Sequence, residues 1–476
     1  MLIHPRTLEL LRPLGVTDGI MARAHTRLRA TLHVGPREVP VSLRDLDLPE
    51  TEFPHLTLLP QVQLERILAD ALTDRGVPVE RGVRLLRVDR DADAVTATVR
   101  TPHAFEQITS RFVAGCDGQD STVRRAAGIG WHSRPYSVEV VLADAELSGD
   151  VDPAGMHVAA AAYGLVFLFP MDGQGQWRLM ATRRSRPQRS GFGRPSGSVA
   201  RVEAQELLDR AALDAEVDEV TWSGVVPLQR GIADDFRSGR LFLVGDAAHT
   251  HSPAGAQGMN SGIADAANLG WKLAVSGLSS DPGTLLGSYA SERRPVARQV
   301  MALTHALFFA EASTALPTRL LRGTVAPLLV PVLPALVGRP GLLTQAVRVL
   351  AQFRVGYRSS PLSVDDGATR ATPGPRAGDR LPDQDALCGG RRLRLHDLTA
   401  GAPGIHLLLS GDATEPDLGP TGGGVTVHRL DDRPGQDVVA VRPDGHVGYR
   451  SSTADPGPLL SWLHLVGALP ATTTSG

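Results

Sequence analysis

The sequence contains little cysteine, little lysine and few aromatic residues. Of its 476 residues only Cys116 and Cys388 are cysteines, too few and too far apart for a disulfide framework or a zinc site. Aromatic residues make up 4% of the chain, and Lys272 is its only lysine, so arginine supplies nearly all of the positive charge. With so little cysteine and no signal-peptide pattern at its start, the chain is expected in a reducing cytosol, without a bound metal.

A large net charge and a long hydrophobic run are also missing. The formal net charge is −2, so no basic face predicts binding to nucleic acid. The longest apolar stretch, residues 324–337, is interrupted by three prolines and is too short to cross a bilayer. We therefore expect neither nucleic acid nor a membrane as a partner. The length predicts two or three domains with a substantial core.

The most informative stretch is residues 240–273, which predicts a buried strand, a tight turn and a helix. Its first five residues form an apolar run that is typical of a strand covered on both faces, and the run stops at Gly245-Asp246. A loop containing Gly255 and Gly258 follows as far as Asn260, and the alanine-rich segment 261–273 predicts the helix. Ligands of open α/β sheets bind outside the carboxyl ends of strands, where a helix N-terminus favours negative charge. A strand-end carboxylate followed by free amides would suit a flavin nucleotide.

A second strand ends in the same way. Residues 111–116 are mostly apolar and are followed by Asp117-Gly118, and Arg124 lies in the first turn of a predicted helix. Because the carboxyl ends of parallel strands meet at one edge of a sheet, we expect Asp117 and Asp246 to lie at the same edge. An Asp-Gly pair alone is a common turn, and its position after a buried strand is what distinguishes this one.

Three segments in a fixed order resemble those of a known family. They are Gly245-Asp246-Ala-Ala-His249, Pro253-Ala-Gly-Ala-Gln-Gly-Met-Asn260 and Tyr289-x-x-Glu292-Arg-Arg-Pro-Val296. On these segments the chain resembles the FAD-dependent aromatic hydroxylases. These are single-component flavoprotein monooxygenases related to para-hydroxybenzoate hydroxylase, and the resemblance is greatest to the branch that acts on aromatic polyketides.

The resemblance implies a set of site residues and a reaction. Carried over residue by residue, the cofactor-binding residues would be Gln61, Asp117, Gly118, Arg124, Gly245, Asp246, Pro253, Gly255, Gly258, Met259 and Asn260. In the family NADPH reduces FAD, and the reduced flavin reacts with dioxygen to give a C4a-hydroperoxide that hydroxylates an electron-rich phenolic ring. The sequence does not distinguish NADPH from NADH, and it nominates no catalytic residue such as a general base.

The chain departs from the family at its start. The first eleven residues predict a helix with no strand before it, whereas the family places a βαβ unit there, with a G-x-G-x-x-G turn for the FAD pyrophosphate. No copy of this turn with the required spacing occurs elsewhere. Either the reading frame starts inside a longer protein, or the chain has lost the unit and tight flavin binding. We favour the first, because a parallel sheet without its central strand would expose unpaired edges.

The predicted fold class is α/β, with an incomplete Rossmann-like FAD-binding sheet, an inserted mixed β-sheet substrate domain and a C-terminal thioredoxin-like domain. Residues 1–130 would form the first, N-terminally truncated part of the FAD-binding domain, and residues 131–228 the substrate sheet. Residues 229–360 would complete the FAD-binding domain and add helices. A linker rich in proline and glycine, residues 373–383, would open the last unit, residues 373–476. That unit has no C-x-x-C, so packing or homodimer contact is expected of it rather than redox chemistry.

The predicted function is hydroxylation of a multi-ring phenolic polyketide of the antibiotic type, with dioxygen as the second substrate. Two alternatives stay open: Baeyer–Villiger oxygenation of a polyketide ketone, and a flavin-deficient, inactive remnant that binds a polyketide or a partner chain. A serine hydrolase is disfavoured because no G-x-S-x-G elbow occurs. Four aromatic residues could stack on a substrate, although the strand patterns favour core positions for them: Phe167, Phe169, Trp177 and Trp222. His249 and His251 are candidates for a base, but a motif histidine beside Asp246 is as often structural, and a His-x-His pair without further ligands is weak evidence for a metal.

Overall fold

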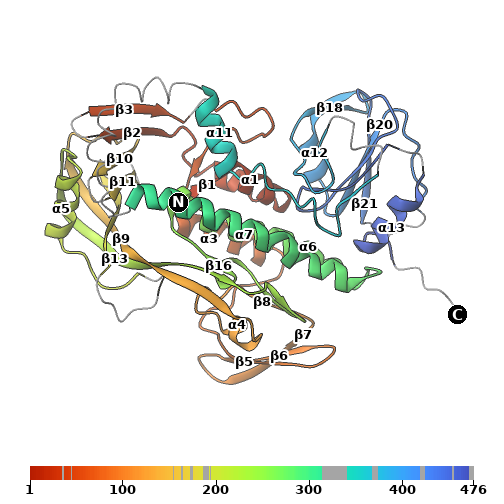
Figure 1. Ribbon diagram of the computed structural model, residues 1–476, viewed down its shortest axis with the longest axis horizontal. Helices are drawn as coiled ribbons and strands as arrows, with labels where there is room; N and C mark the ends of the chain where they lie inside the picture. Colours follow the sequence, from red (N-terminus) through yellow and green to blue (C-terminus); the bar gives the residue numbers. More distant parts are fainter. Residues whose placement is uncertain are drawn as a thin grey trace.

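The computed structural model describes residues 1–470 except for one long gap at 313–339 and short gaps at 35–36, 44–45, 154, 162–163, 172–174, 186–191, 193–194, 367–373, 419–423 and 453–454. The apolar stretch at 324–337 falls outside the described residues. Along the longest axis, a large sheet lies at one end, long helices cross the middle, and a smaller mixed sheet lies at the other end (Figure 1). None of the helices within the described ranges is both long and apolar enough to cross a bilayer.

The large sheet has eight strands in the order β16-β13-β9-β12-β11-β10-β2-β3. Its strands are β2 (Arg29–Val34), β3 (Arg37–Ser42), β9 (Trp131–Gly149), β10 (Met156–Ala161), β11 (Gly164–Pro170), β12 (Gln176–Arg184), β13 (Ala215–Ala233) and β16 (His249–Thr250). All neighbours are antiparallel except β10 and β2. The sheet predicted within residues 131–228 is therefore present, and it also takes strands from before and after that segment.

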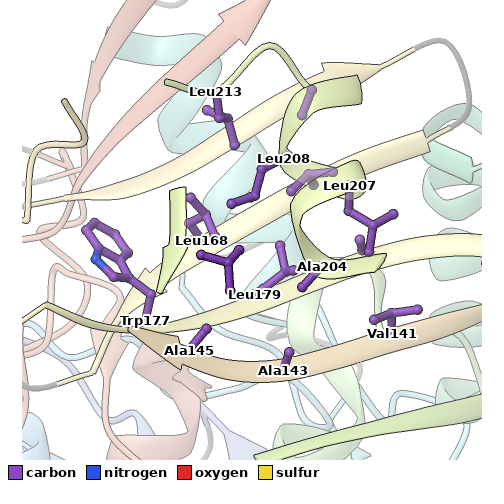
Figure 2. Packing of buried hydrophobic residues seen from close by; sticks show 14 of the residues in the cluster. Val141, Ala143, Ala145, Leu168, Trp177, Leu179, Ala204, Leu207, Leu208 and Leu213 are labelled. Carbon is purple, nitrogen blue, oxygen red and sulfur yellow. The ribbon is translucent and has the colours of Figure 1, made fainter. Parts of the chain in front are cut away.

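Alternation along β12 divides this sheet into a closed face and an open face. Trp177, Leu179 and Ala181 are at most 3% exposed and pack toward helix α5 (Arg201–Arg210), which confirms the core position expected for Trp177. Figure 2 labels the residues of this core as Val141, Ala143, Ala145, Leu168, Trp177, Leu179, Ala204, Leu207, Leu208 and Leu213. Because successive side chains of a strand point to opposite faces, the residues between these positions belong to the other face of the sheet.

A three-stranded sheet in the order β14-β15-β8 lies below the central helices (Figure 1). It consists of β8 (Val113–Gly115), β14 (Arg237–Ser238) and β15 (Leu241–Leu243), and β15 runs parallel to β8. Every residue of β15 is fully buried, as predicted for a strand covered on both faces. The helices that contribute to this core are α4 (Thr122–Ala126), α6 (Gln257–Val275) and α7 (Pro282–Ala312). A separate antiparallel sheet consists of β5 (Arg84–Arg90), β6 (Val95–Arg100) and β7 (Phe105–Ser110).

The first residues of the chain pack against the start of α6. A two-residue strand, β1 (Leu2–Ile3), pairs with β4 (Thr57–Leu58), so the expectation that no strand precedes the first helix is wrong. Two residues are too few to give a periodic sequence pattern. The helices of this segment are α1 (Pro5–Leu11), the 3₁₀ helix η1 (Arg12–Leu14), α2 (Thr17–Met21) and α3 (Gln61–Thr73).

The C-terminal unit is a five-stranded mixed sheet in the order β17-β23-β22-β20-β21 with a small hairpin and two helices. Its elements are β17 (Val364–Asp365), β18 (Asp385–Cys388), β19 (Arg391–Arg394), α12 (Leu395–Ala400), β20 (Ile405–Ser410), β21 (Val425–Leu430), β22 (Val438–Val441), β23 (Val447–Ser451) and α13 (Gly457–Leu465). Its core extends to Trp271 of α6 and Leu285 of α7, so the unit is packed on the central helices.

The linker predicted at residues 373–383 is not a loose connection in its described part. Ala377, Leu381 and Asp383 are at most 2% exposed, and the Gly378 backbone N–H donates to the carbonyl of Val447. Proline and glycine content predicted a flexible segment, but long-range packing holds these residues in place. The helix before it, α11 (Pro340–Leu350), lies over the start of α6.

Candidate functional site

The carboxyl ends of β8 and β15 form one edge of the three-stranded sheet. Gly115 is in register with Leu243, so Asp117 and Asp246 follow adjacent parallel strands and lie at the same edge, as expected. Asp117 has a structural role there: its carboxylate accepts hydrogen bonds from the backbone N–H groups of Thr122 and Val123 and caps α4.

Arg124 joins the two strand ends. Its guanidinium donates to the carbonyl of Ala247, which follows Asp246, and to the carbonyl of Gln119, and it stacks over the ring of Trp131 at 4.1 Å. Gly118 adopts a left-handed backbone with φ of 76°, which reverses the chain between β8 and α4. A contact of either residue with a cofactor stays a prediction.

Asp246 is the free carboxylate of this edge. It is exposed and makes no hydrogen bond or ion pair within the described part of the chain. The preceding Gly245 has φ of 58°, and its N–H donates to the buried Oδ2 of Asp265. An added Cβ at Gly245 would lie 3.6 Å from the Cα of Gly262, so this strand end reaches the second turn of α6.

A buried ionic group fixes the strand end on the helices. The carboxylate of Asp265 accepts hydrogen bonds from His249 Nε2 at 2.8 Å and from Arg293 Nε at 2.6 Å. Burial alone would raise the pKa of Asp265, but Arg293 and His249 outweigh it and lower the pKa to about 2. His249 therefore has a structural role, which was one of the two roles left open from the sequence. Within the described residues no group of three candidate ligands could hold a metal.

The glycine-rich loop ends where α6 begins, four residues earlier than predicted. Gly255 and Ala256 have φ of 70° and 53°, and the helix starts at Gln257, so the first turn of α6 contains Gly258 and Met259. Backbone N–H groups in a first helical turn have no partner within the helix and favour negative charge.

The side chain of Asn260 is fully used in holding this loop. Its Oδ1 accepts from the backbone N–H of His4 and from the hydroxyl of Thr7, and its Nδ2 donates to the carbonyls of Leu2 and Ala256. Asn260 can therefore offer a ligand only its backbone, and its role toward the cofactor stays a prediction.

A cavity of about 550 Å³ lies between the start of α6 and the open face of the eight-stranded sheet. Five residues predicted to bind the cofactor line it: Gln61, Pro253, Gly255, Gly258 and Met259. The side chains from the sheet include Val140, Leu142, Met156, Leu165, Phe167, Phe169, Arg178, Met180 and Thr182. Phe167 and Phe169, for which core positions were favoured, are thus in the cavity wall.

The cavity wall is mostly apolar and contains no carboxylate among the described residues. Its guanidinium, that of Arg178, donates from Nε and Nη2 to the two oxygens of Asp144, each at 2.7 Å. The hydroxyl of Thr182 has no hydrogen-bond partner among the residues that the structure describes. Strand alternation in β12 was the sequence signal that could have identified Arg178, Met180 and Thr182, because the intervening residues form the core.

The predicted residues therefore form two groups along the first two turns of α6. Asp117, Gly118, Arg124, Gly245 and Asp246 lie at the strand ends, and Gln61, Pro253, Gly255, Gly258 and Met259 line the cavity. One helical turn is about 5.4 Å, so an extended ligand could reach from the free carboxylate of Asp246 to the cavity. This arrangement fits a flavin nucleotide, with hydroxyl groups near Asp246 and a flat ring near the amides of the α6 first turn.

Comparison with known proteins agrees with this geometry. Residues 1–304 match the family described as FAD binding domain. The chain is 34% identical over 382 residues to a 6-methylpretetramide 4-monooxygenase of Streptomyces rimosus, covering 78% of this chain and 66% of that protein. It is 30% identical over 464 residues to the uncharacterized aromatic compound monooxygenase YhjG of Bacillus subtilis (strain 168), covering 95% and 87%. The chain thus spans just under two thirds of the first of these relatives.

Solved structures show the same fold. The anhydrotetracycline hydroxylase OxyS of Streptomyces rimosus superposes with a TM-score of 0.76 at 25% identity, covering 99% of this chain and 91% of that one. CabE, an aromatic hydroxylase from angucycline biosynthesis, gives a TM-score of 0.73 at 26% identity, covering 98% and 91%. The match to the FAD binding domain over most of the chain, together with these relatives, shows that the chain belongs to the family of FAD-dependent aromatic monooxygenases.

Proposed function

We propose that this protein is an FAD- and NADPH-dependent monooxygenase that hydroxylates a multi-ring phenolic polyketide. The observation that carries the proposal is the apolar cavity at the first turn of α6, together with the strand-end carboxylate of Asp246, which has no partner among the described residues. Its volume of about 550 Å³ lies within the range of small-molecule sites. The relatives named after tetracycline precursors and angucycline biosynthesis support a multi-ring aromatic substrate.

The residues of the chain would perform three tasks at this site. Asp246 would accept a hydrogen bond from a cofactor hydroxyl, and the amides of Gly258 and Met259 would favour negative charge on the flavin ring. The apolar side chains of the sheet would exclude water from the reacting atoms. When bound, FAD would supply the reaction with dioxygen and the transfer of one oxygen atom to an electron-rich ring carbon.

The polar groups of the cavity would orient the substrate. Arg178 is held by Asp144 and presents a cation to a cavity that otherwise lacks charged side chains of the described chain. A phenolic or enolic oxygen is the group that such a cation would attract. Neither His249 nor His251 is among the residues that line the cavity, so we nominate neither of these two histidines as a general base.

The experiment is to purify the protein from this sequence and measure its bound flavin by visible absorbance. Oxidation of NADPH and of NADH would then be followed with a panel of multi-ring phenols, and the products analysed by mass spectrometry. We expect bound FAD, faster oxidation of NADPH than of NADH in the presence of a phenol, and a product that gains one oxygen atom on an intact ring system.

Other outcomes would favour the alternatives. A product with oxygen inserted into the carbon skeleton beside a ketone would identify the reaction as Baeyer–Villiger oxygenation rather than hydroxylation. Colourless protein that takes up no added FAD would favour a flavin-deficient binding protein. A cytosolic location and a homodimer also stay predictions, and cell fractionation and sedimentation would test them.

A further inference from the structure

Methionine is concentrated in the wall of the cavity. The chain has seven methionines, and five of them line the cavity: Met1, Met156, Met171, Met180 and Met259. The cavity is lined by 26 of the 476 residues, so an even spread of methionine would place fewer than one there. Only Met21 and Met301 lie elsewhere.

The internal methionines approach the cavity from different walls. Met156 and Met180 belong to β10 and β12 of the sheet, Met171 follows the end of β11, and Met259 lies in the first turn of α6. A ligand in the cavity would therefore meet a thioether side chain from the sheet and from the helix at once.

Two phenylalanines also line the cavity. The rings of Phe167 and Phe169 on β11 are nearly parallel, with an interplanar angle of 4° and centroids 6.1 Å apart. Phe167 is in register with Met180 of β12, so a thioether borders this aromatic surface. Flat aromatic ligands stack on such rings, and thioether sulfur also makes favourable contacts with aromatic groups.

Methionine differs from the other apolar residues in its adaptability. Its side chain is unbranched, has three rotatable bonds and fills irregular gaps, and it is overrepresented at binding surfaces that accept several partners. Leucine has a similar volume and usually replaces methionine without a large loss of stability, but its branched side chain adopts fewer shapes. A cavity wall of methionines can therefore change its shape at a small cost in free energy.

We propose that the cavity accepts flat fused-ring aromatics of several outlines, and that Met156 and Met180 determine this breadth. The inference rests on the proposed function, because it concerns the substrate class of the same site. The ligands are neutral or acidic aromatics, since no carboxylate from the described residues lines the cavity to attract a cation. The sheet methionines adjust to the ligand, and the phenylalanines hold its ring plane.

The test compares ligand binding by the wild-type protein with that of a Met156→Leu/Met180→Leu variant. The ligands are a set of three hydroxylated aromatics: a linear tricyclic, a linear tetracyclic and an angular tetracyclic compound. Dissociation constants are measured by calorimetry, without turnover. The matched control is Met21→Leu/Met301→Leu, which makes the same exchange outside the cavity.

The expected result is that the wild-type protein and the control bind all three ligands within about tenfold of one another. In the Met156→Leu/Met180→Leu variant, affinity for at least one ligand should fall tenfold or more while another is retained. Equal relative affinities in this variant and the wild type would overturn the inference and leave the proposed function intact. Binding of none of the aromatics by the wild-type protein would overturn both.

Discussion

Asp265 illustrates at the residue scale how a buried charge sets the geometry of a nearby site. Its carboxylate is fully buried, and it holds the backbone of Gly245, the ring of His249 and the guanidinium of Arg293 at the same time. None of these atoms lines the cavity, yet they fix the strand end that carries the free carboxylate of Asp246. Residues of this kind position a site without touching its ligand.

Replacing Asp265 by asparagine should destabilise the protein and lower its flavin content. An amide keeps the shape but leaves the charge of Arg293 buried without its countercharge, which costs about 3–5 kcal/mol. Urea unfolding followed by flavin absorbance would measure both effects. The control is Glu206→Gln, which breaks an exposed pair with Arg210 and should cost less than about 1 kcal/mol. An unchanged unfolding midpoint for Asp265→Asn would contradict the structural role assigned to it.

Two buried histidines predict a loss of stability in mild acid. Burial lowers the pKa of His4 and of His251 to about 4, whereas the ordinary value in an unfolded chain is about 6.5. Between these values the unfolded chain binds more protons than the folded one, so stability is complete above pH 6.5 and is lost as the pH falls toward 4. Each histidine accounts for about 3 kcal/mol over this range.

Urea unfolding at about pH 7 and about pH 5 would measure this loss, and in His251→Gln the difference between the two midpoints should shrink. Equal midpoints at the two pH values in the unsubstituted protein would show that neither histidine is held neutral. The carboxylate of Asp265, whose lowered pKa is about 2, gives up its contribution only at lower pH and does not interfere.

At the scale of elements, sequence patterns predicted most strands and helices, and they failed where an element is short or begins in glycine. The mixed sheet within residues 131–228 and the helix that contains Arg124 occur as predicted because their signals are local to each segment. The start of α6 was placed four residues too late, because Gly258 is a poor helix residue in isolation. Long-range contacts from the N-terminal segment and α11 hold that first turn instead.

The left-handed backbone of Ala256 marks the beginning of α6 as a strained position. A φ of 53° is costly for a residue with a Cβ and more so for a β-branched one. Ala256→Val should therefore lower the free energy of unfolding by about 1–2 kcal/mol or more, while Ala256→Gly should be close to neutral. The control is Ala266→Val, exposed within α6, where only helix propensity of about 0.5 kcal/mol is lost. Equal losses at the two alanines in thermal unfolding would exclude backbone strain as the cause.

At the scale of the whole molecule, a buried cluster of charges joins the C-terminal unit to the central helices. The guanidinium of Arg442 donates to both oxygens of Glu292 on α7, at 2.7 and 2.8 Å, and also to Asp444. Asn268 on α6 donates to both Glu292 and Asp444. All of these side chains are at most 3% exposed, so the contact is an interior of the protein rather than a surface between loosely tethered parts.

Arg442→Met should strongly weaken the contact between the C-terminal unit and the central helices. It leaves two buried carboxylates without their guanidinium, at a cost of about 3–5 kcal/mol, and the C-terminal unit should unfold before the rest. Calorimetry would show a separate early transition, and proteolysis would reach the described residues 374–383 sooner. The control is Arg358→Met, which breaks an exposed pair with Asp379 and should leave one transition. A single unshifted transition in Arg442→Met would show that apolar packing alone holds the unit.

Contacts between distant segments of the chain could be predicted from the sequence only in part. The adjacent strand ends at Asp117 and Asp246 were predictable because parallel strands share an edge. The burial of residues 377–383 was not, because proline and glycine content records only local preference. The cavity was not predictable as a volume, since its walls come from β9, β10, β11, β12 and the first turn of α6, which meet only in the folded chain (Figure 1).

The sole lysine of the chain lies in the buried charged cluster between the C-terminal unit and the central helices. The ammonium of Lys272 is fully buried and donates to Glu292 and Asn268. Acylating reagents that modify lysine should therefore leave its side chain unmodified in native protein and react with it once denaturant opens the core, which peptide mass spectrometry would detect. Coupling to a solid support or a dye through side-chain amines would accordingly fail, and the same residue would serve as an internal reporter of unfolding.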